Sequence, residues 1–291
     1  MEKIQMNAME VKKKAAEFGA DLVGIAPVSR FSHLPKESNP ASIFPQAESL
    51  IVIGRRIPHG SLRGVNEGTE LQNSFNHFGL FYLEDQYLAK TTYDLTIWFE
   101  AQGFEAVPMF AYDYSGQVQA VPVSPDKPAP NVYVDYQLAA QAAGLGEIGR
   151  NGLFLTREFG TLQRFAMLLT DEKLDVDETF KPRLCQNCNA CAEACPLKAI
   201  DAKKTGKKGI PGAECDTFTV NKSLCAKCQN GAVQCDEGRF YKTERISASC
   251  GRACLAALEE KGLVKTKFKN RFNTASTWKR DYLGETINTN I

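Results

Sequence analysis

The chain has 291 residues, with 35 basic and 34 acidic side chains and a formal net charge of +1. Its hydrophobic fraction of 43% provides for a sizeable core, and its near-zero net charge argues against bulk attraction to nucleic acid. No apolar run approaches the roughly 20 residues that cross a bilayer, and the N-terminus shows neither a signal-peptide core nor a twin arginine. These features predict a cytoplasmic protein that contacts no membrane.

Segments of helical and of strand-like composition alternate along the first 172 residues. The first helix has an apolar stripe formed by Met9, Val11, Ala15 and Phe18. Such alternation favours an α+β fold in which helices and strands form layers. The predicted helices cover residues 7–18, 80–102 and 135–143, the predicted strands cover 21–26, 50–53, 104–109 and 165–169, and a proline-rich loop covers 124–131.

A polar stretch after this half separates it from a cysteine-rich part. We therefore divide the chain into a domain over residues 1–172, a module over 173–260 and a basic C-terminal tail over 261–291. Aromatic residues interleave with the lysines and arginines of the tail, as in some RNA contacts. Such tails more often pack their aromatic rings on the core and leave the charges in water, so nucleic acid is not an expected partner.

All ten cysteines lie between Cys185 and Cys254, which suits metal ligation better than scattered buried thiols. The run Cys185-x2-Cys188-x2-Cys191-x3-Cys195-Pro196 has the spacing of bacterial iron–sulfur proteins. There, three thiolates hold one 4Fe–4S cluster and the fourth belongs to a second cluster. A structural zinc site would instead take four ligands in pairs. The run predicts two 4Fe–4S clusters.

The cysteines after this run are less regular, and they leave two assignments open. The preferred assignment gives Cys254 to the first cluster, with Cys185, Cys188 and Cys191, and it gives Cys195, Cys225, Cys235 and Cys250 to the second. A competing assignment builds the second cluster on Cys225-x2-Cys228 and leaves Cys250 and Cys254 over. Cys215 and Cys228 are the alternative ligands, and any leftover cysteine is expected to be a buried, inert thiol.

A glycine-rich turn spans residues 143–153. Gly144, Gly146 and Gly149 match a dinucleotide-binding fingerprint only in part, and the turn follows a predicted helix where that fingerprint follows a strand. A nicotinamide dinucleotide site is therefore not predicted. Taken alone, the glycines indicate a tight turn or a close approach of the backbone to a flat ligand.

The order of these motifs resembles the corrinoid-dependent reductive dehalogenases and the epoxyqueuosine reductases. The glycine turn is followed by Arg164, by Leu169-Thr-Asp171 and then by the Cys185 run. The resemblance implies a nitroreductase-like N-terminal domain that holds cobalamin beside a ferredoxin-like module with two clusters. It also implies that the turn contacts the cofactor through Gly144, Gly146, Gly149, Arg150, Asn151 and Gly152.

The same resemblance implies a proton donor upstream of the turn. Epoxyqueuosine reductases carry an aspartate in a similar segment, which points to Asp135, although Asp135 stands closer to the turn. Dehalogenase-like sites use a tyrosine near a cation, which points to Tyr133 or Tyr136. The chain shows neither the export signal of the dehalogenases nor the helical-repeat extension of the epoxyqueuosine reductases, so the sequence names no substrate.

Together these features predict an anaerobic iron–sulfur oxidoreductase. Electrons from an external ferredoxin or flavodoxin would cross two 4Fe–4S clusters to a corrinoid, where a small-molecule substrate is reduced. Two alternatives remain open. The chain is either an electron carrier or accessory protein without a substrate of its own, or a flavin-type reductase in the same fold.

Overall fold

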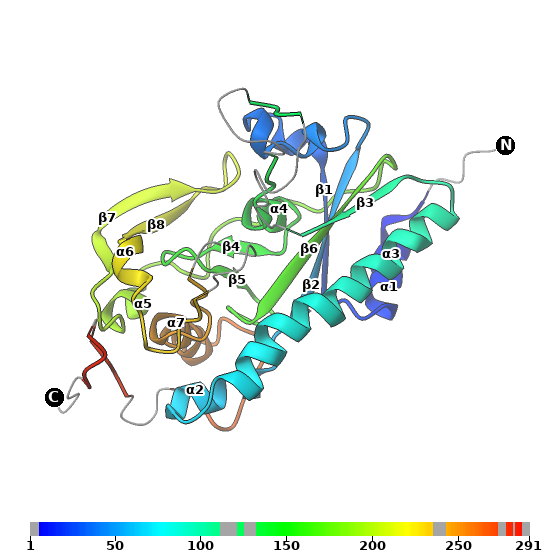
Figure 1. The fold of residues 1–291 in the computed structure, drawn as a ribbon. Coiled ribbons are helices and arrows are strands. Elements are labelled where there is room, and N and C mark those ends of the chain that lie inside the picture. The colour runs from blue at the N-terminus through cyan, green and yellow to red at the C-terminus, as the bar shows by residue number, and fades with distance from the viewer. Residues whose placement is uncertain are drawn as a thin grey trace.

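The computed structural model describes residues 6–110, 121–124, 132–234, 243–272, 278–281 and 283–286. Its centre is a four-stranded sheet in the order β1-β2-β6-β3, and all three pairings are antiparallel (Figure 1). Ile51 of β2 pairs with Ile25 of β1 on one side and with Leu168 of β6 on the other. The strands are β1 (Leu22–Pro27), β2 (Ser49–Arg56), β3 (Ala106–Met109) and β6 (Gln163–Thr170).

Alternation along the strands explains why both faces of this sheet are covered. Leu50 and Val52 point to the face beneath α4 (Tyr136–Ala142), whereas Ile51 and Ile53 point to the opposite face. That opposite face is covered by α1 (Ala8–Glu17) and α3 (Ala89–Ala101), as Figure 1 shows. The three predicted helices and four predicted strands are thus confirmed in position.

The first helix differs from its prediction in one residue. Val11 and Ala15 are buried against the sheet, but Met9 is 77% exposed. Position 9 lies on the solvent side of α1, because Ala8 and not Met9 continues the buried stripe. The proline-rich loop lies outside the described residues except for Ser124.

A long helical path leads into α3. It passes through two π-helical segments, η5 and η6, so the helix predicted from residue 80 begins earlier. The path and the short helices before it are η1 (Val28–Phe31), η2 (Lys36–Ser38), η3 (Pro40–Ser42), η4 (His59–Leu62), α2 (Arg63–Glu67), η5 (Gln72–Phe81) and η6 (Leu83–Leu88).

The cysteine-rich part packs beside the helix α4 and a small hairpin (Figure 1). The hairpin consists of β4 (Gly146–Ile148) and β5 (Phe154–Thr156). The cysteine-rich part itself contains α5 (Ala190–Glu193), β7 (Ile200–Lys208), β8 (Cys215–Val220), α6 (Lys222–Cys225) and α7 (Ser249–Glu260).

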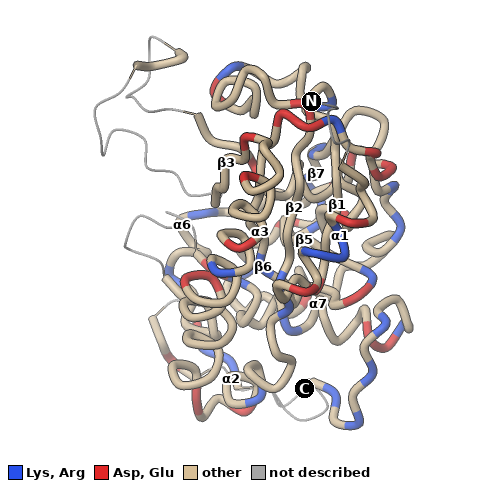
Figure 2. The backbone as a smooth tube through the Cα atoms, turned by 90° about the vertical axis from the view of Figure 1, so that its right-hand side faces the viewer, with Lys and Arg blue, Asp and Glu red and all other residues tan. Residues whose placement is uncertain are grey.

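The C-terminal tail belongs to the same body as the rest of the chain. Phe272 is buried in an apolar cluster with Leu62, Phe75 and Leu255, and the Trp278 indole N–H donates to the carbonyl oxygen of Val65 at 3.0 Å. Phe272 and Trp278 thus pack on the core as expected, whereas Phe268 is 42% exposed. Basic and acidic residues are interspersed over the described chain (Figure 2). None of the helices in the described ranges is both long and apolar enough to cross a bilayer.

Candidate active site and cluster-binding cysteines

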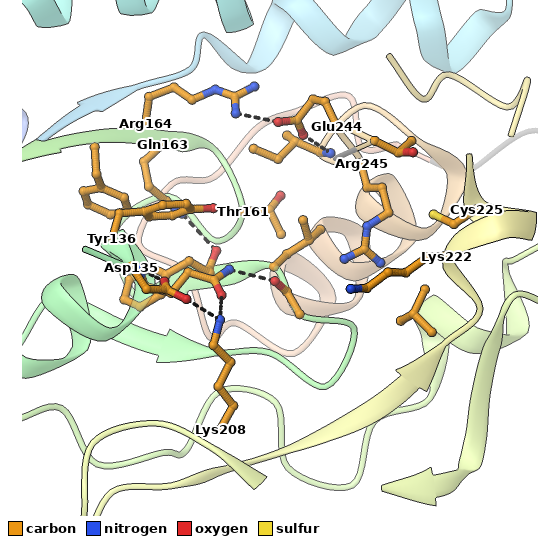
Figure 3. Close-up of a pocket in the computed structure, with 18 of the residues that line it drawn as sticks. Asp135, Tyr136, Thr161, Gln163, Arg164, Lys208, Lys222, Cys225, Glu244 and Arg245 are labelled. Carbon is orange, nitrogen blue, oxygen red and sulfur yellow. Dashed lines mark hydrogen bonds and ion pairs between the residues drawn. The ribbon is translucent and has the colours of Figure 1, made fainter. Parts of the chain in front are cut away.

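A cavity of about 790 Å³ lies where the sheet, the glycine turn and the cysteine-rich part meet (Figure 3). This volume lies in the upper part of the range found for ligand sites, roughly 300–1,000 Å³. Tyr133, Asp135 and Tyr136 all line it, together with Lys208. Cys225 lines it as well. The cavity therefore brings the predicted proton donors and a predicted cluster ligand to one space.

Asp135 has both carboxylate oxygens engaged. One oxygen accepts a hydrogen bond from the backbone N–H of Gln137 at 2.8 Å and so caps the N-terminus of α4. The other forms an ion pair with the Lys208 ammonium group at 2.7 Å, and the Gln137 side-chain oxygen accepts from the same group at 2.8 Å. Asp135 thus orders the cavity wall and holds Lys208 there.

Tyr136 follows Asp135 at the start of α4 and stacks on Phe165, with ring centroids 6.1 Å apart. Burial raises the pKa of the Tyr136 hydroxyl well above its ordinary value, and the nearby charges of Glu244 and Asp135 add to the shift. The hydroxyl therefore keeps its proton at neutral pH. It is a hydrogen-bond donor, and a source of a proton, in the wall of the cavity.

A buried ion network forms the cavity wall next to Tyr136. The Arg164 guanidinium lies 2.5 Å from Glu244 and 3.6 Å from Glu84, and it also donates to the carbonyl oxygen of Gly79 at 3.0 Å. Burial would raise the pKa of Glu244, but Arg164 outweighs it and holds this pKa below its ordinary value. Arg164 itself has a raised pKa, because the two carboxylates overcome the cost of its burial.

The opposite wall of the cavity carries positive charge beside a thiol. Lys222 and Arg245 both line the cavity, and Figure 3 shows their side chains next to each other and close to Cys225. Cys225 is the last residue of α6, whose N-terminus is capped by the side chain of Asn221. Burial raises the pKa of the Cys225 thiol, and Arg245 partly offsets that rise.

Four thiols gather around the start of the cysteine-rich part. Cys185 and Cys254 share an apolar cluster with Leu184 and Leu258. Burial is the main cause that raises the pKa of Cys185 to about 11 and that of Cys191 to about 12, and the neighbouring Cys188 contributes to both shifts. Cys254 has a strongly raised pKa from burial and from the same three thiols. The structure thus places Cys185, Cys188, Cys191 and Cys254 near one another, and their binding of one cluster stays a prediction.

A second set of four thiols lies next to the first, on the side of the cavity. Cys195 packs with Cys250 in an apolar cluster at the start of α7. Burial is the main cause that raises the pKa of Cys250 to about 12, and the thiols of Cys195, Cys225 and Cys228 contribute to this shift. This set differs from the preferred assignment because it contains Cys228, while Cys235 lies outside the described residues.

Cys215 lies apart from both sets. Its thiol is buried in β8, where the side-chain N–H of Gln141 donates to the sulfur at 3.5 Å. In the described part of the chain, no three His, Cys, Asp or Glu side chains converge as they would around a single metal ion.

Comparison with known proteins finds similarity to iron–sulfur proteins and reductases. Residues 179–201 match the family model of the 4Fe-4S binding domain. A tetrachloroethene reductive dehalogenase of Dehalobacter restrictus is 37% identical over 113 residues, which cover 31% of this chain and 20% of that protein. An epoxyqueuosine reductase of Gloeobacter violaceus is 28% identical over 189 residues, which cover 62% of this chain and 52% of that protein.

This chain is a reductive dehalogenase- and epoxyqueuosine reductase-like protein with a 4Fe–4S ferredoxin domain. Its homologues are reductases, and its matches span one fifth to about one half of their length. A catabolic reductive dehalogenase solved with 3-bromo-4-hydroxybenzoic acid has a TM-score of 0.55 at 17% identity, covering 84% of this chain and 30% of that one. At that identity the likeness concerns the fold.

The dehalogenase-like glycine turn supports both the cavity and the cysteines. Gly152 lines the cavity. Gly144 adopts a φ of +77°, and a Cβ on Gly146 would lie 2.0 Å from the carbonyl oxygen of Leu155, so these two glycines serve the turn and the hairpin. The Arg150 backbone N–H donates to the Cys185 sulfur at 3.3 Å. Contact of Gly144, Gly146, Gly149, Arg150, Asn151 and Gly152 with a cofactor stays a prediction.

Several cavity residues of this reductase-like chain have no motif that would reveal them in the sequence. Lys208 lies in β7, more than 70 positions after Asp135 in the chain, so only folding brings the two side chains together. Glu84 and Glu244 meet Arg164 from two separate segments. Arg164 itself could be recognised from the sequence, because it stands between the glycine turn and the Cys185 run in the order of motifs.

Proposed function

We propose that this chain is an iron–sulfur reductase that delivers electrons through two 4Fe–4S clusters to a cofactor in the cavity, where a small-molecule substrate is reduced. The cavity is the observation that carries this proposal. Cys225, a ligand of the cluster nearer to it, lines one wall, and the protonated Tyr136 and the Asp135–Lys208 pair line the other. An external ferredoxin or flavodoxin would supply the electrons.

The clusters occupy the two thiol sets. Cys185, Cys188, Cys191 and Cys254 hold the outer cluster, and the set around Cys195, Cys225 and Cys250 holds the inner one. Each thiol loses its proton when it binds iron, which overcomes the raised pKa values caused by burial. Such clusters persist where thiols stay reduced, so we place the protein in the cytoplasm.

The cofactor we propose is a corrinoid. It would supply a low-potential metal centre for two-electron reduction of the substrate. The cavity offers it both donors and acceptors along its walls, from Lys222 and Arg245 to Gln163. His33, His59 and His77 are the three histidines of the chain, and none of them lines the cavity, so the corrinoid would bind without an imidazole ligand from the protein. We also infer a nitroreductase-like fold for residues 1–172.

In this proposal Tyr136 gives a proton to the reduced substrate. The environment of its hydroxyl keeps it protonated at neutral pH. The Asp135–Lys208 pair fixes the start of α4, which carries Tyr136, and the nearby Arg164 guanidinium is the positive charge that favours the phenolate left behind. Tyr133 also lines the cavity and belongs to the same wall.

Anaerobic reconstitution tests the proposal. We expect the chain, supplied with iron, sulfide and cobalamin, to retain about eight irons and about one corrinoid after desalting. Ala226 lines the cavity and is exposed, whereas its neighbour Lys227 is exposed and does not line the cavity. Ala226→Trp should therefore abolish corrinoid retention and keep the iron, and Lys227→Trp should keep both.

The alternatives give different outcomes in the same experiment. A protein that holds its iron but never retains a corrinoid contradicts the corrinoid assignment. If mass spectrometry then finds a flavin bound in an Ala226-dependent manner, the flavin-type reductase is correct. If no organic cofactor is retained, the chain is an electron carrier.

A further inference from the structure

The spacing of the first cysteine run recurs near the end of the cysteine-rich part with two thiols replaced, because the position that corresponds to Cys185 is Glu244. Cys188-x2-Cys191-x3-Cys195 in the first run corresponds to Ser247-x2-Cys250-x3-Cys254 in the second. In two-cluster ferredoxins each run supplies ligands by this repeated spacing, with its last cysteine on the other cluster. Ser247 therefore stands at a position where the spacing calls for a thiol ligand of the inner cluster.

Ser247 is unsuited to replace that thiol. It is fully buried, at 0% exposure, and its hydroxyl has no hydrogen-bond partner among the described residues. Its carbonyl oxygen accepts a hydrogen bond from the Arg252 guanidinium, so the backbone at 247 is fixed. A neutral hydroxyl is a hard, weak ligand, whereas iron–sulfur clusters select soft thiolates. Because positions 244 and 247 both lack a thiol, the inner cluster needs two thiols from elsewhere, and Cys225 supplies one of them.

Cys228 lies where such a thiol is needed. Its backbone N–H donates to the carbonyl oxygen of Cys225 at 3.1 Å, so the two cysteines occupy one turn after α6. Two residues later, the carbonyl oxygen of Asn230 accepts from the backbone N–H of Ser249 at 3.0 Å, next to Cys250. The Cys228 thiol is close enough to influence the thiols of both Cys225 and Cys250.

We propose that Cys228 is the fourth ligand of the inner cluster, with Cys195, Cys225 and Cys250, and that it replaces the thiol absent at position 247. The Cys228 thiol transfers its proton to solvent as the sulfur binds iron, and no electron is exchanged in that step. This inference rests on the proposed two-cluster function. It makes Cys235 dispensable, contrary to the preferred assignment from the sequence.

Three single variants and one double variant test this assignment after anaerobic reconstitution of the full chain. Iron and acid-labile sulfide are counted, and the reduced clusters are observed by electron paramagnetic resonance. We expect Cys228→Ala to fall from about eight irons to about four, with one cluster signal left, and Cys235→Ala and Ser247→Ala to keep about eight. The double variant Cys228→Ala/Ser247→Cys should regain about eight irons and both signals.

The remaining outcomes are distinguishable. Two results would overturn the assignment of Cys228 even if the unaltered protein holds two clusters. One is a full complement of about eight irons in Cys228→Ala, and the other is a loss to about four irons in Cys235→Ala or Ser247→Ala. Failure of the double variant to regain the second cluster also contradicts it, since position 247 would then not be equivalent. About four irons in the unaltered protein would instead refute the two-cluster function itself.

Discussion

At the scale of single residues, Glu147 shows how one buried carboxylate positions the loop that carries Cys185. It lies in β4 of the hairpin, and its two oxygens accept hydrogen bonds from the backbone N–H groups of Arg183, Leu184 and Cys185. Hydrogen bonds to a charged acceptor are roughly twice as strong as neutral ones. Glu147 thus fixes the backbone at Cys185, which we propose as the first ligand of the outer cluster.

Replacing this carboxylate should loosen the outer cluster. A Gln at position 147 would turn an N–H₂ group toward backbone donors and leave at least one of them unsatisfied, at a cost of about 1–3 kcal/mol. We expect Glu147→Gln to release iron to a chelator faster than the unaltered protein. Glu193→Gln, an exposed change in the same module, is the matched control and should not alter the rate. Equal rates in both variants would contradict this role.

At the scale of elements, the helix α7 links the two thiol sets. Cys250 and Cys254 lie one turn apart on it and belong to different thiol sets. The helix packs closely on the preceding segment, because a Cβ on Gly251 would lie 2.2 Å from the carbonyl oxygen of Arg245 and 2.3 Å from that of Ile246. Any side chain at 251 must therefore displace α7 or this segment.

Gly251→Ala should accordingly weaken both clusters at once. Overpacking of this kind costs about 1–3 kcal/mol and shifts the backbone that bears the ligands. We expect iron content to fall for both clusters and the midpoint of thermal unfolding to drop. Gly60→Ala is the control, because a Cβ at residue 60 meets no atom within 4 Å. Loss of one cluster signal alone would show that α7 does not couple the two sites.

The elements of the sheet were largely predictable from sequence, because burial on alternating faces follows directly from the pattern of apolar residues. The run from Leu50 to Ile53 is apolar at every position, as expected for a strand covered on both faces. The antiparallel pairing was not encoded in this local pattern. It depends on β6 returning between β2 and β3 from more than 50 positions further along the chain.

The site was predictable only where its spacing is local. Cys185, Cys188 and Cys191 lie within seven positions of one another. The x3 spacing between Cys250 and Cys254 repeats that of the first run and so predicted a role for Cys254. The choice between Cys228 and Cys235 depends on which turn of the chain reaches α7, and spacing alone does not supply this. The same is true of the Asp135–Lys208 pair and of the Arg164 network, whose members meet only through the fold.

At the scale of the whole molecule, the buried thiols couple stability to pH when iron is absent. Cys185 has a pKa of about 11, and Cys191 and Cys250 have pKa values of about 12. These values lie above the ordinary thiol value of about 8.5. Above that value the folded state binds more protons than the unfolded state, so the free energy of unfolding decreases as pH rises.

This coupling predicts a difference between the metal-free and the loaded protein. The contribution of the thiols is fully present below their ordinary pKa and is lost as pH rises toward about 11–12. Thiolates bound to iron are already deprotonated, so loading removes the effect. Between about pH 8 and pH 10, on either side of the ordinary thiol pKa, the thermal midpoint of the metal-free protein should fall more steeply than that of the loaded protein. Parallel pH profiles would contradict this coupling.

The central claim is that the inner cluster lies in the wall of a cavity that holds the reducible cofactor. Its most direct test is electron paramagnetic resonance of the fully reconstituted protein, with the inner cluster reduced and the corrinoid in its paramagnetic cobalt(II) state. The account predicts magnetic coupling between the two centres that persists in Lys227→Trp and disappears together with the corrinoid in Ala226→Trp. A corrinoid that is bound at full occupancy but shows no coupling to either cluster would contradict it.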